Sequence, residues 1–189
     1  MRILILFISI LFTLPTLANW QLVNEKSQFN FVTTKKNSAT EVHQFTQLRG
    51  SISAQGEVNL TIDLTSVETN IPIRNERIQE FLFKTGIFPK ATFTATINQR
   101  DIEQLNAGDL KQVELTGEIN LHGVKQAIST RVQVIKLKAN RLQVSSLQPI
   151  IIQAKAFKLD TSIEKLQALA SLPSISHAVP ITFSLAFTQ

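Results

Sequence analysis

Histidine is the first residue type to consider for chemistry, because imidazole can bind a metal ion or act as a general base. The chain has three histidines, His43, His122 and His177, which lie far apart and lack the spacing of a metal site. It has no cysteine, so neither a disulfide nor a lipidated cysteine is available. We expect the histidines to occupy surface or turn positions, and we expect no metal site and no cofactor.

Other catalytic arrangements are also missing from the sequence. No nucleophile elbow of the form G-x-S-x-G occurs, and the six glycines are too scattered to form a phosphate-binding loop. Asp63, Glu68, Glu114 and Glu118 fall on the polar faces of predicted strands, where solvated carboxylates are expected. The sequence therefore predicts no catalytic residues and a protein that is not an enzyme.

The phenylalanines give a stronger signal, since the chain has twelve of them and no tyrosine. Four crowd one connection and its flanks: Phe81, Phe83, Phe88 and Phe93. Singly, each fits ordinary core packing, but as a group they suit the mouth of an apolar cavity. Arg74 and Arg77 precede them on a predicted helix, where they could meet an anionic or polar headgroup. Exposed arginines without a ligand are the commoner alternative.

The elements that must position these residues are mostly strands. Residues 50–64 alternate with a two-residue period that places Ile52, Val58, Leu60 and Ile62 on one face, so we expect one long strand. Similar patterns predict strands near residues 20–34, 42–48, 92–98, 113–121, 124–137, 142–157 and 179–187. A phase shift at Ile135 and Leu137 indicates a bulge.

Two short helical insertions interrupt this series. We expect one from Asn75, acting as its cap, to Phe83, and a second that opens at a capping box over Thr161–Glu164. The sequence thus predicts an all-β fold, a lipocalin-like eight-stranded antiparallel barrel with two short helical insertions. Small residues in the inward phase favour a hollow interior over a packed one: Ala54, Gly56, Ala95 and Gly117.

The N-terminus has the features of an export signal. Arg2, an apolar run over residues 3–14 and small residues up to Ala18 predict a signal peptide over residues 1–18, too short to span a bilayer. A single domain then covers residues 19–189, and we expect it in the periplasm. The net charge of +5 is thinly spread. It argues against nucleic acid as a partner and predicts transient contact with an anionic membrane surface.

Five segments resemble the YceI-like family of polyisoprenoid-binding, lipocalin-like periplasmic proteins: residues 66–69 (SVET), 74–77 (RNER), 81–83 (FLF), 88–93 (FPKATF) and 115–125 (LTGEINLHGVK). The resemblance implies an elongated barrel around a long isoprenoid or similar amphiphile. Residues 154–158 (AKAFK) depart from the R-x-D-F-G-like motif of many members. The resemblance implies ligand contacts from the inward apolar residues Phe29, Phe31, Val58, Leu60, Ile62, Phe93, Ile97, Leu115, Ile119, Val132 and Val134, with Phe81 and Phe88 as flap candidates.

Three hypotheses follow. The leading one is an exported protein that carries or sequesters an isoprenoid-tailed lipid, such as a quinone or polyprenyl phosphate, with Arg74 and Arg77 at its headgroup. Burying one five-carbon unit gains about 4 kcal/mol before ordering costs. The second is a structural or interaction protein with a packed barrel. The third, a lipid hydrolase or isomerase, lacks the polar constellation that it would need. Nothing in the sequence indicates an oligomeric state.

Overall fold

The computed structural model describes residues 19–189, which form one antiparallel sheet of twelve strands with short helices. The predicted signal peptide lies outside the described residues. The strands are β1 (Trp20–Leu22), β2 (Gln28–Lys35), β3 (Ala39–Phe45), β4 (Leu48–Ile52), β5 (Glu57–Asp63), β6 (Val67–Glu68), β7 (Lys90–Thr96), β8 (Leu110–Leu121), β9 (Val124–Lys138), β10 (Arg141–Ser146), β11 (Ile150–Gln153) and β12 (Ala178–Thr188). The helices are α1 (Pro72–Arg77), α2 (Arg100–Glu103), α3 (Asp160–Leu169) and the π-helix η3 (Ile78–Phe83), with 3-10 turns at Asn24–Lys26, Leu64–Ser66 and Ala154–Phe157.

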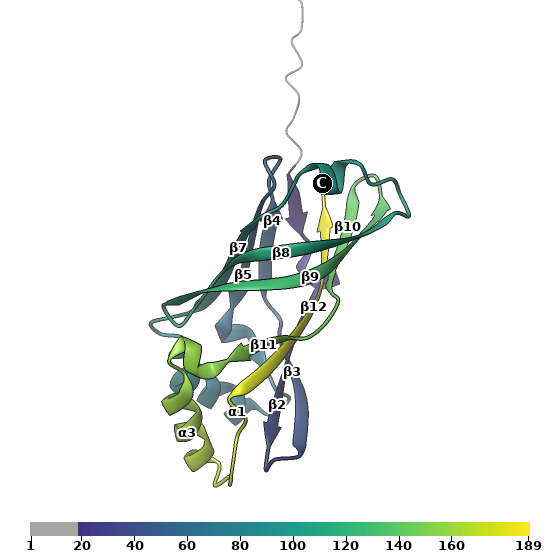
Figure 1. The fold of residues 1–189 in the computed structure, drawn as a ribbon. Coiled ribbons are helices and arrows are strands. Elements are labelled where there is room, and N and C mark those ends of the chain that lie inside the picture. The colour runs from purple at the N-terminus through teal and green to yellow at the C-terminus, as the bar shows by residue number, and fades with distance from the viewer. Residues whose placement is uncertain (1–18) are drawn as a thin grey trace, which may run out of the picture.

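Eight strands close into a ring in the order β1, β4, β5, β7, β8, β9, β10 and β12. The ring closes where β12 pairs with β1, through Gln21 opposite Thr188 and Leu22 opposite Phe187. Closure pairs the backbone groups that an open sheet would leave at its edges. The predicted all-β, lipocalin-like, eight-stranded antiparallel barrel is therefore confirmed, and Figure 1 shows that the molecule is elongated along it.

Below the ring the sheet continues but no longer closes. β12 extends past the ring and pairs with β2, with Ile181 opposite Phe31, and the order continues to β3 and β6. β11 pairs with the other side of β12. β5 ends at Asp63, and the chain then passes through a 3-10 turn and the short strand β6 before it enters the helical segment α1–η3. The helices α1, η3 and α3 lie beside this lower sheet, at the end of the molecule opposite the C-terminus (Figure 1).

The predicted single strand over residues 50–64 is wrong. The chain turns at Ser53–Gly56, so that β4 and β5 form a hairpin with Ile52 opposite Val58. Gly56 has φ +82°, and a Cβ there would lie 2.1 Å from the carbonyl oxygen of Ile97. Only glycine fits this turn. The alternation runs unbroken through the hairpin because both arms put their apolar side chains on the same face of the sheet.

The two expected helices exist, but both begin differently. α1 starts at Pro72, a position that suits a residue without an N–H, and it continues into η3 up to Phe83. Asn75 does not cap this helix, since its Oδ1 accepts hydrogen bonds from the backbone N and the hydroxyl of Thr69, at 2.9 and 2.6 Å. α3 starts at Asp160, and no side chain caps it. The predicted capping box is therefore wrong.

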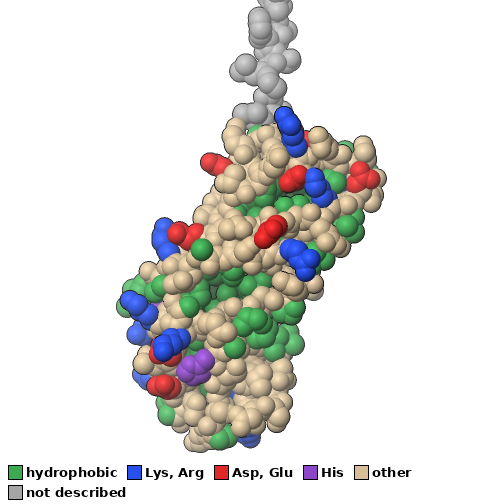
Figure 2. Space-filling view, viewed as in Figure 1, with side chains coloured by type: hydrophobic (Ala, Val, Ile, Leu, Met, Phe, Trp, Pro, Cys, Tyr) green, Lys and Arg blue, Asp and Glu red, His purple; other side chains and the backbone are tan. Residues whose placement is uncertain are grey.

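A bulge in β9 is confirmed, but it lies at Leu137 alone, because Ile135 stays in register opposite Gln143. Arg141 pairs with Lys138 whereas Leu142 pairs with Lys136, so the register passes over Leu137. This shift leaves Leu137 exposed on the outside and turns Leu142 into the core, where it is fully buried. None of the helices in residues 19–189 has both the length and the apolar character that crossing a bilayer requires. On the face drawn in Figure 2, basic and acidic side chains are scattered, with hydrophobic side chains exposed between them.

Candidate functional site

Two adjoining cavities run through the molecule. The upper chamber, inside the closed ring, has a volume of about 100 Å³. The lower chamber, between the lower sheet and the helices, has a volume of about 340 Å³. Five side chains line both chambers and form the junction between them: Phe29, Ile62, Ala91, Ile119 and Ile181. The two chambers therefore make one slot that is wide below and narrow above.

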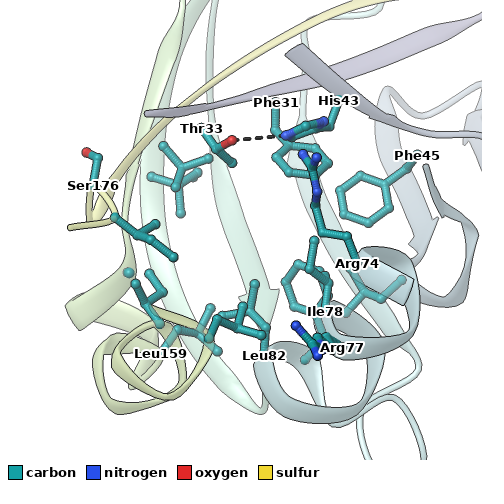
Figure 3. Close-up of a pocket in the computed structure, with 18 of the residues that line it drawn as sticks. Phe31, Thr33, His43, Phe45, Arg74, Arg77, Ile78, Leu82, Leu159 and Ser176 are labelled. Atoms are coloured by element: carbon teal, nitrogen blue, oxygen red, sulfur yellow. Dashed lines mark hydrogen bonds between the residues drawn. The ribbon is translucent and has the colours of Figure 1, made fainter. Parts of the chain in front are cut away.

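The lower chamber has an aromatic wall and an aliphatic wall. The rings of Phe31 and Phe45 from β2 and β3 lie 5.1 Å apart, and Phe45 lies 5.9 Å from Phe83 of η3. Across the chamber lie Ile163 of α3 and Leu159, the residue just before that helix. Figure 3 shows Phe31, Phe45 and Leu159 bordering a common space from segments far apart in the sequence. Such walls favour an apolar occupant.

Polar side chains gather on one side of the lower chamber. Glu41 accepts a hydrogen bond from Arg74 Nη1 at 2.6 Å and is also ion-paired with Lys35. His43 Nε2 lies 3.0 Å from Thr33 Oγ1, the contact drawn in Figure 3, and 3.7 Å from Glu41 Oε2. The arrangement holds Arg74 against the chamber wall, with its charge already balanced by a carboxylate.

Two pKa values in this cluster are shifted. The hydrogen bond from Lys35, followed by the nearby charge of Arg74, holds the pKa of Glu41 below its usual value despite partial burial. Burial lowers the pKa of His43 below 6.5, and the neighbouring Arg74 lowers it further, whereas Glu41 opposes the shift. At neutral pH, His43 is therefore uncharged and Glu41 is ionised. The imidazole that lines the lower chamber is thus neutral at this pH.

The upper chamber is lined by inward residues of the ring strands. Leu60, Phe93 and Leu115 lie among them. Thr130 also lines it, is buried, and its hydroxyl has no hydrogen-bond partner among the described residues. No group of three or more His, Asp or Glu side chains that could hold a metal ion occurs in residues 19–189. The upper chamber is thus almost wholly hydrocarbon.

The model of the YceI-like domain matches residues 20–187. The chain belongs to the YceI-like family. Among individual YceI-like relatives, the protein YceI of Escherichia coli is 32% identical over 83 residues, which cover 43% of this chain and 39% of YceI itself. The aligned part is thus well under two thirds of that relative.

Solved structures match over more of the chain. A polyisoprenoid binding domain from Saccharophagus degradans has 38% sequence identity and a TM-score of 0.89, covering 92% of this chain and 99% of that one. Burkholderia cenocepacia BcnA matches with 19% identity and a TM-score of 0.68, covering 87% of this chain and 98% of that one. The second likeness concerns the fold alone. The resemblance noted in the sequence is confirmed by these matches.

Most of the predicted site residues of this YceI-like chain line the two chambers. Phe29, Ile62 and Ile119 lie at the junction, and Phe31 lines the lower chamber together with Arg74 and Arg77. The remaining barrel residues line the upper chamber: Val58, Leu60, Phe93, Ile97, Leu115, Val132 and Val134. The inward phase inferred from the sequence therefore corresponds to the cavity walls.

The two flap candidates lie elsewhere. Phe81 lines neither chamber, and Lys165 Nζ lies 4.0 Å from its ring centroid. Phe88 packs 4.5 Å from the ring of His122, beside Gly123. Within η3 it is Ile78 and Phe83 that are buried and line the lower chamber, whereas Phe81 is only partly buried. Phe81 thus packs against Lys165 of α3, and Phe88 packs against the β8–β9 turn.

The small residues do not make the space inside this YceI-like barrel. None of Ala54, Gly56, Ala95 and Gly117 lines a chamber. A Cβ on Gly117 would lie 2.6 Å from the ring of Phe93, which already fills that position. The expectation that these residues leave room is wrong. The space of the lower chamber comes instead from the separation between the lower sheet and the helices.

Several residues that line the lower chamber, His43 among them, are not predicted as site residues by the sequence. His43 was expected at the surface or in a turn, but it is 5% exposed in β3. The expectation holds for His122, which lies at the β8–β9 turn, and His177 is partly exposed before β12. The pattern of His43 and Phe45 at alternate positions could have indicated that both point inward. The contribution of α3 was indicated by its apolar stripe, which includes Ile163 and Leu166.

Lowering the pH from about 7 to about 5 is expected to destabilise the protein through the histidines whose pKa is lowered in the folded state, His43 above all. Because the folded pKa of His43 lies below 6.5, the unfolded chain binds protons more readily in this range. Stability contributed by neutral His43 is therefore complete above about 6.5 and is lost as the pH falls through the folded pKa. Urea unfolding across this range should show a slope of at most about 1.4 kcal/mol per pH unit for each histidine.

His43→Gln should reduce that slope, since glutamine keeps an amide near the position of Nε2 and does not titrate. The pKa of His122 is lowered as well, by burial and by the charge of Lys84, so His43→Gln combined with His122→Gln should flatten the slope further. Glu41 titrates below this range. A His43→Gln variant with the full wild-type slope would contradict the assignment.

Proposed function

We propose that this YceI-like protein is exported and that it carries or sequesters an isoprenoid-tailed amphiphile, such as a quinone or a polyprenyl phosphate, in the two joined chambers. The observation that carries the proposal is the slot itself: a wide chamber and a narrow one share five lining side chains, and most of the side chains that line them are apolar. Its shape suits one long, flexible, apolar chain.

The similarity to solved structures supports the choice of ligand. The Saccharophagus degradans structure is described as a polyisoprenoid binding domain, and it aligns with 92% of this chain at 38% identity. Each five-carbon unit of a tail would gain about 4 kcal/mol on burial, so a few units outweigh the cost of ordering the tail and fixing the complex. Binding of this kind needs no reactive side chain.

We assign the residues by chamber. Leu60, Phe93 and Leu115 would contact the far end of the tail, and Phe29 would contact it at the junction. The headgroup would remain in the lower chamber, beside Arg74 and Arg77. Arg77 is better placed for a negative charge, because Glu41 already balances Arg74 whereas Arg77 donates only to the backbone oxygen of Leu169, at 3.3 Å. Phe81 and Phe88 are given no contact with the ligand.

Export is part of the proposal. An apolar run after Arg2 and the absence of cysteine suit a protein that is secreted without disulfides. The periplasm, between two bilayers, would give a carrier its lipid. Expression with residues 1–18 intact, followed by fractionation of the cells, should place the protein in the periplasmic fraction, shortened at the N-terminus.

The test is extraction of the native protein. Protein purified from its own host without detergent is treated with organic solvent, and the extract is examined by mass spectrometry. An isoprenoid-tailed lipid at about one molecule per protein is the expected result. A lipid-free extract would favour the second hypothesis, a structural barrel, and would overturn the proposal. Extraction of denatured, refolded protein is the control for lipids that adhere nonspecifically.

A further inference from the structure

The lower chamber opens at one end of the molecule. Three of the side chains that line it are exposed, Ile71, Ile73 and Ala170, and all three lie where α1 meets the end of α3. Every other lining residue of the lower chamber is buried or partly buried. The mouth is therefore bordered by α1, the last turn of α3 and the segment that follows it.

The hairpin between β2 and β3 completes this end of the molecule. The backbone N of Lys36 donates to the oxygen of Ser174 at 3.2 Å, and Ser174 Oγ donates to Asn37 Oδ1 at 2.8 Å. Lys35 forms an isolated β-bridge with Ile175. The tip of the hairpin is thus fixed against the chain that follows α3. Figure 1 shows this end opposite the C-terminus, so neither described terminus covers the mouth.

The residues around the mouth combine apolar and basic side chains. We define the rim as Lys36, Ile71, Ile73, Arg77 and Leu169. Ile73 is 53% exposed, and Ile71 and Leu169 are 41% exposed, values that are high for such large side chains. Arg77 bridges two parts of the rim through its hydrogen bond to the oxygen of Leu169.

The charge of the rim is positive. On the β2–β3 hairpin, α1 and the last turn of α3, the cations are Lys35, Lys36, Arg74 and Arg77, and the carboxylates are Glu41 and Glu76. Glu41 is ion-paired with both Lys35 and Arg74. Lys36 and Arg77 have no carboxylate partner among the described residues. Apolar side chains beside unbalanced cations match a surface with negative headgroups above hydrocarbon.

We propose that the rim docks onto a bilayer that contains anionic phospholipid, with Ile71, Ile73 and Leu169 entering the headgroup region and Lys36 and Arg77 contacting the phosphates. In this orientation the mouth of the lower chamber faces the membrane. A tail could then pass between bilayer and chamber without crossing water. That passage rests on the proposed lipid binding, but docking itself does not, because the rim is a surface feature.

The experiment is cosedimentation with sucrose-loaded vesicles of phosphatidylglycerol and phosphatidylcholine, compared with phosphatidylcholine alone. Residues 19–189 are used because they hold the whole barrel and omit the apolar N-terminal run. Binding to the anionic vesicles, weakened by added salt, is the expected result. Lys36→Gln should lower the partition coefficient of the protein between anionic vesicles and solution about fivefold, and Leu169→Ser should lower it about tenfold.

Matched controls lie at the other end of the barrel. Leu110 is 53% exposed and Lys138 is exposed as well, so Leu110→Ser and Lys138→Gln repeat the same changes away from the rim. These variants should bind the vesicles as the unmodified protein does. Equal losses in rim and control variants, or equal binding to both kinds of vesicle, would overturn the proposal.

Two further outcomes separate the alternatives. Lys36 and Leu169 line neither chamber, so their variants should retain extracted lipid at the unmodified level. Docking without extracted lipid would support this inference while contradicting the proposed function. A dimer that forms with rising concentration and is lost in Leu169→Ser, with no vesicle binding, would show that a second copy covers the rim, and would overturn the proposal.

Discussion

Replacing Ala91 by leucine is expected to reduce the lipid recovered from the native protein at least tenfold. Ala91 lies on β7 opposite Ile62, is 4% exposed, and lines both chambers at their junction. A leucine side chain would occupy the passage from the lower to the upper chamber. The part of the tail beyond that point would lose its burial, at about 4 kcal/mol for each five-carbon unit. That loss is more than a tenfold change in affinity.

Ala95→Leu is the matched control for this change. Ala95 lies on the same strand, four residues along and in the same inward phase, but it lines neither chamber. Both variants add the same three carbons, and overpacking costs about 1–3 kcal/mol. Urea unfolding reports that cost, and solvent extraction with mass spectrometry reports the lipid. If Ala91→Leu keeps a lipid of unchanged tail length, the tail does not pass the junction.

Replacing Leu142 by alanine is expected to lower the free energy of unfolding by about 2–5 kcal/mol. Leu142 is 0% exposed and sits on β10 between its partners Lys136 on β9 and Phe187 on β12. It lines neither chamber, and it belongs to the cluster of buried hydrophobic residues that forms the core. Truncation therefore removes a buried side chain and leaves a new void next to the point where the ring closes.

Leu110→Ala is the comparison, because Leu110 is mostly solvent-exposed, and it should change stability by less than about 0.5 kcal/mol. Urea midpoints and slopes for both variants give the two free energies. A small cost at Leu142 would mean that the strands around it relax into the void. Such a result would contradict the tight packing that separates this part of the barrel from the chambers.

Together, Ala91→Leu and Leu142→Ala distinguish the hollow part of the barrel from the packed part. The ring near Leu142 is filled by its own side chains, whereas the walls at Phe29 and Ala91 border open space. Natural cores are packed nearly as densely as crystals, so a ligand that fills the slot in the folded protein would add stability. Bound lipid should therefore raise the resistance of the protein to urea.

Much of the barrel could be predicted from local pattern. A two-residue period fixes which side chains share a face of a sheet, so the inward phase of Leu60, Leu115 and Val132 follows from the sequence, and their cavity role follows from the family resemblance. The bulge near Leu137 was also readable, because one extra residue shifts that period. The hairpin at Ser53–Gly56 cannot be predicted from this alternation, because the apolar positions keep the same two-residue phase in both arms.

The lower chamber depended on contacts that no local pattern contains. Arg74 meets Glu41 across 33 residues of sequence, and that pair forms only because α1 lies against β3. His43 is buried because the helices cover its face of the sheet, and Phe81 faces outward because of how η3 packs. The sequence by itself determined the closed barrel and its inward faces, since alternation is a property of each strand. Tertiary structure alone decided where the barrel opens, because the width of a chamber depends on the packing of segments distant in the chain.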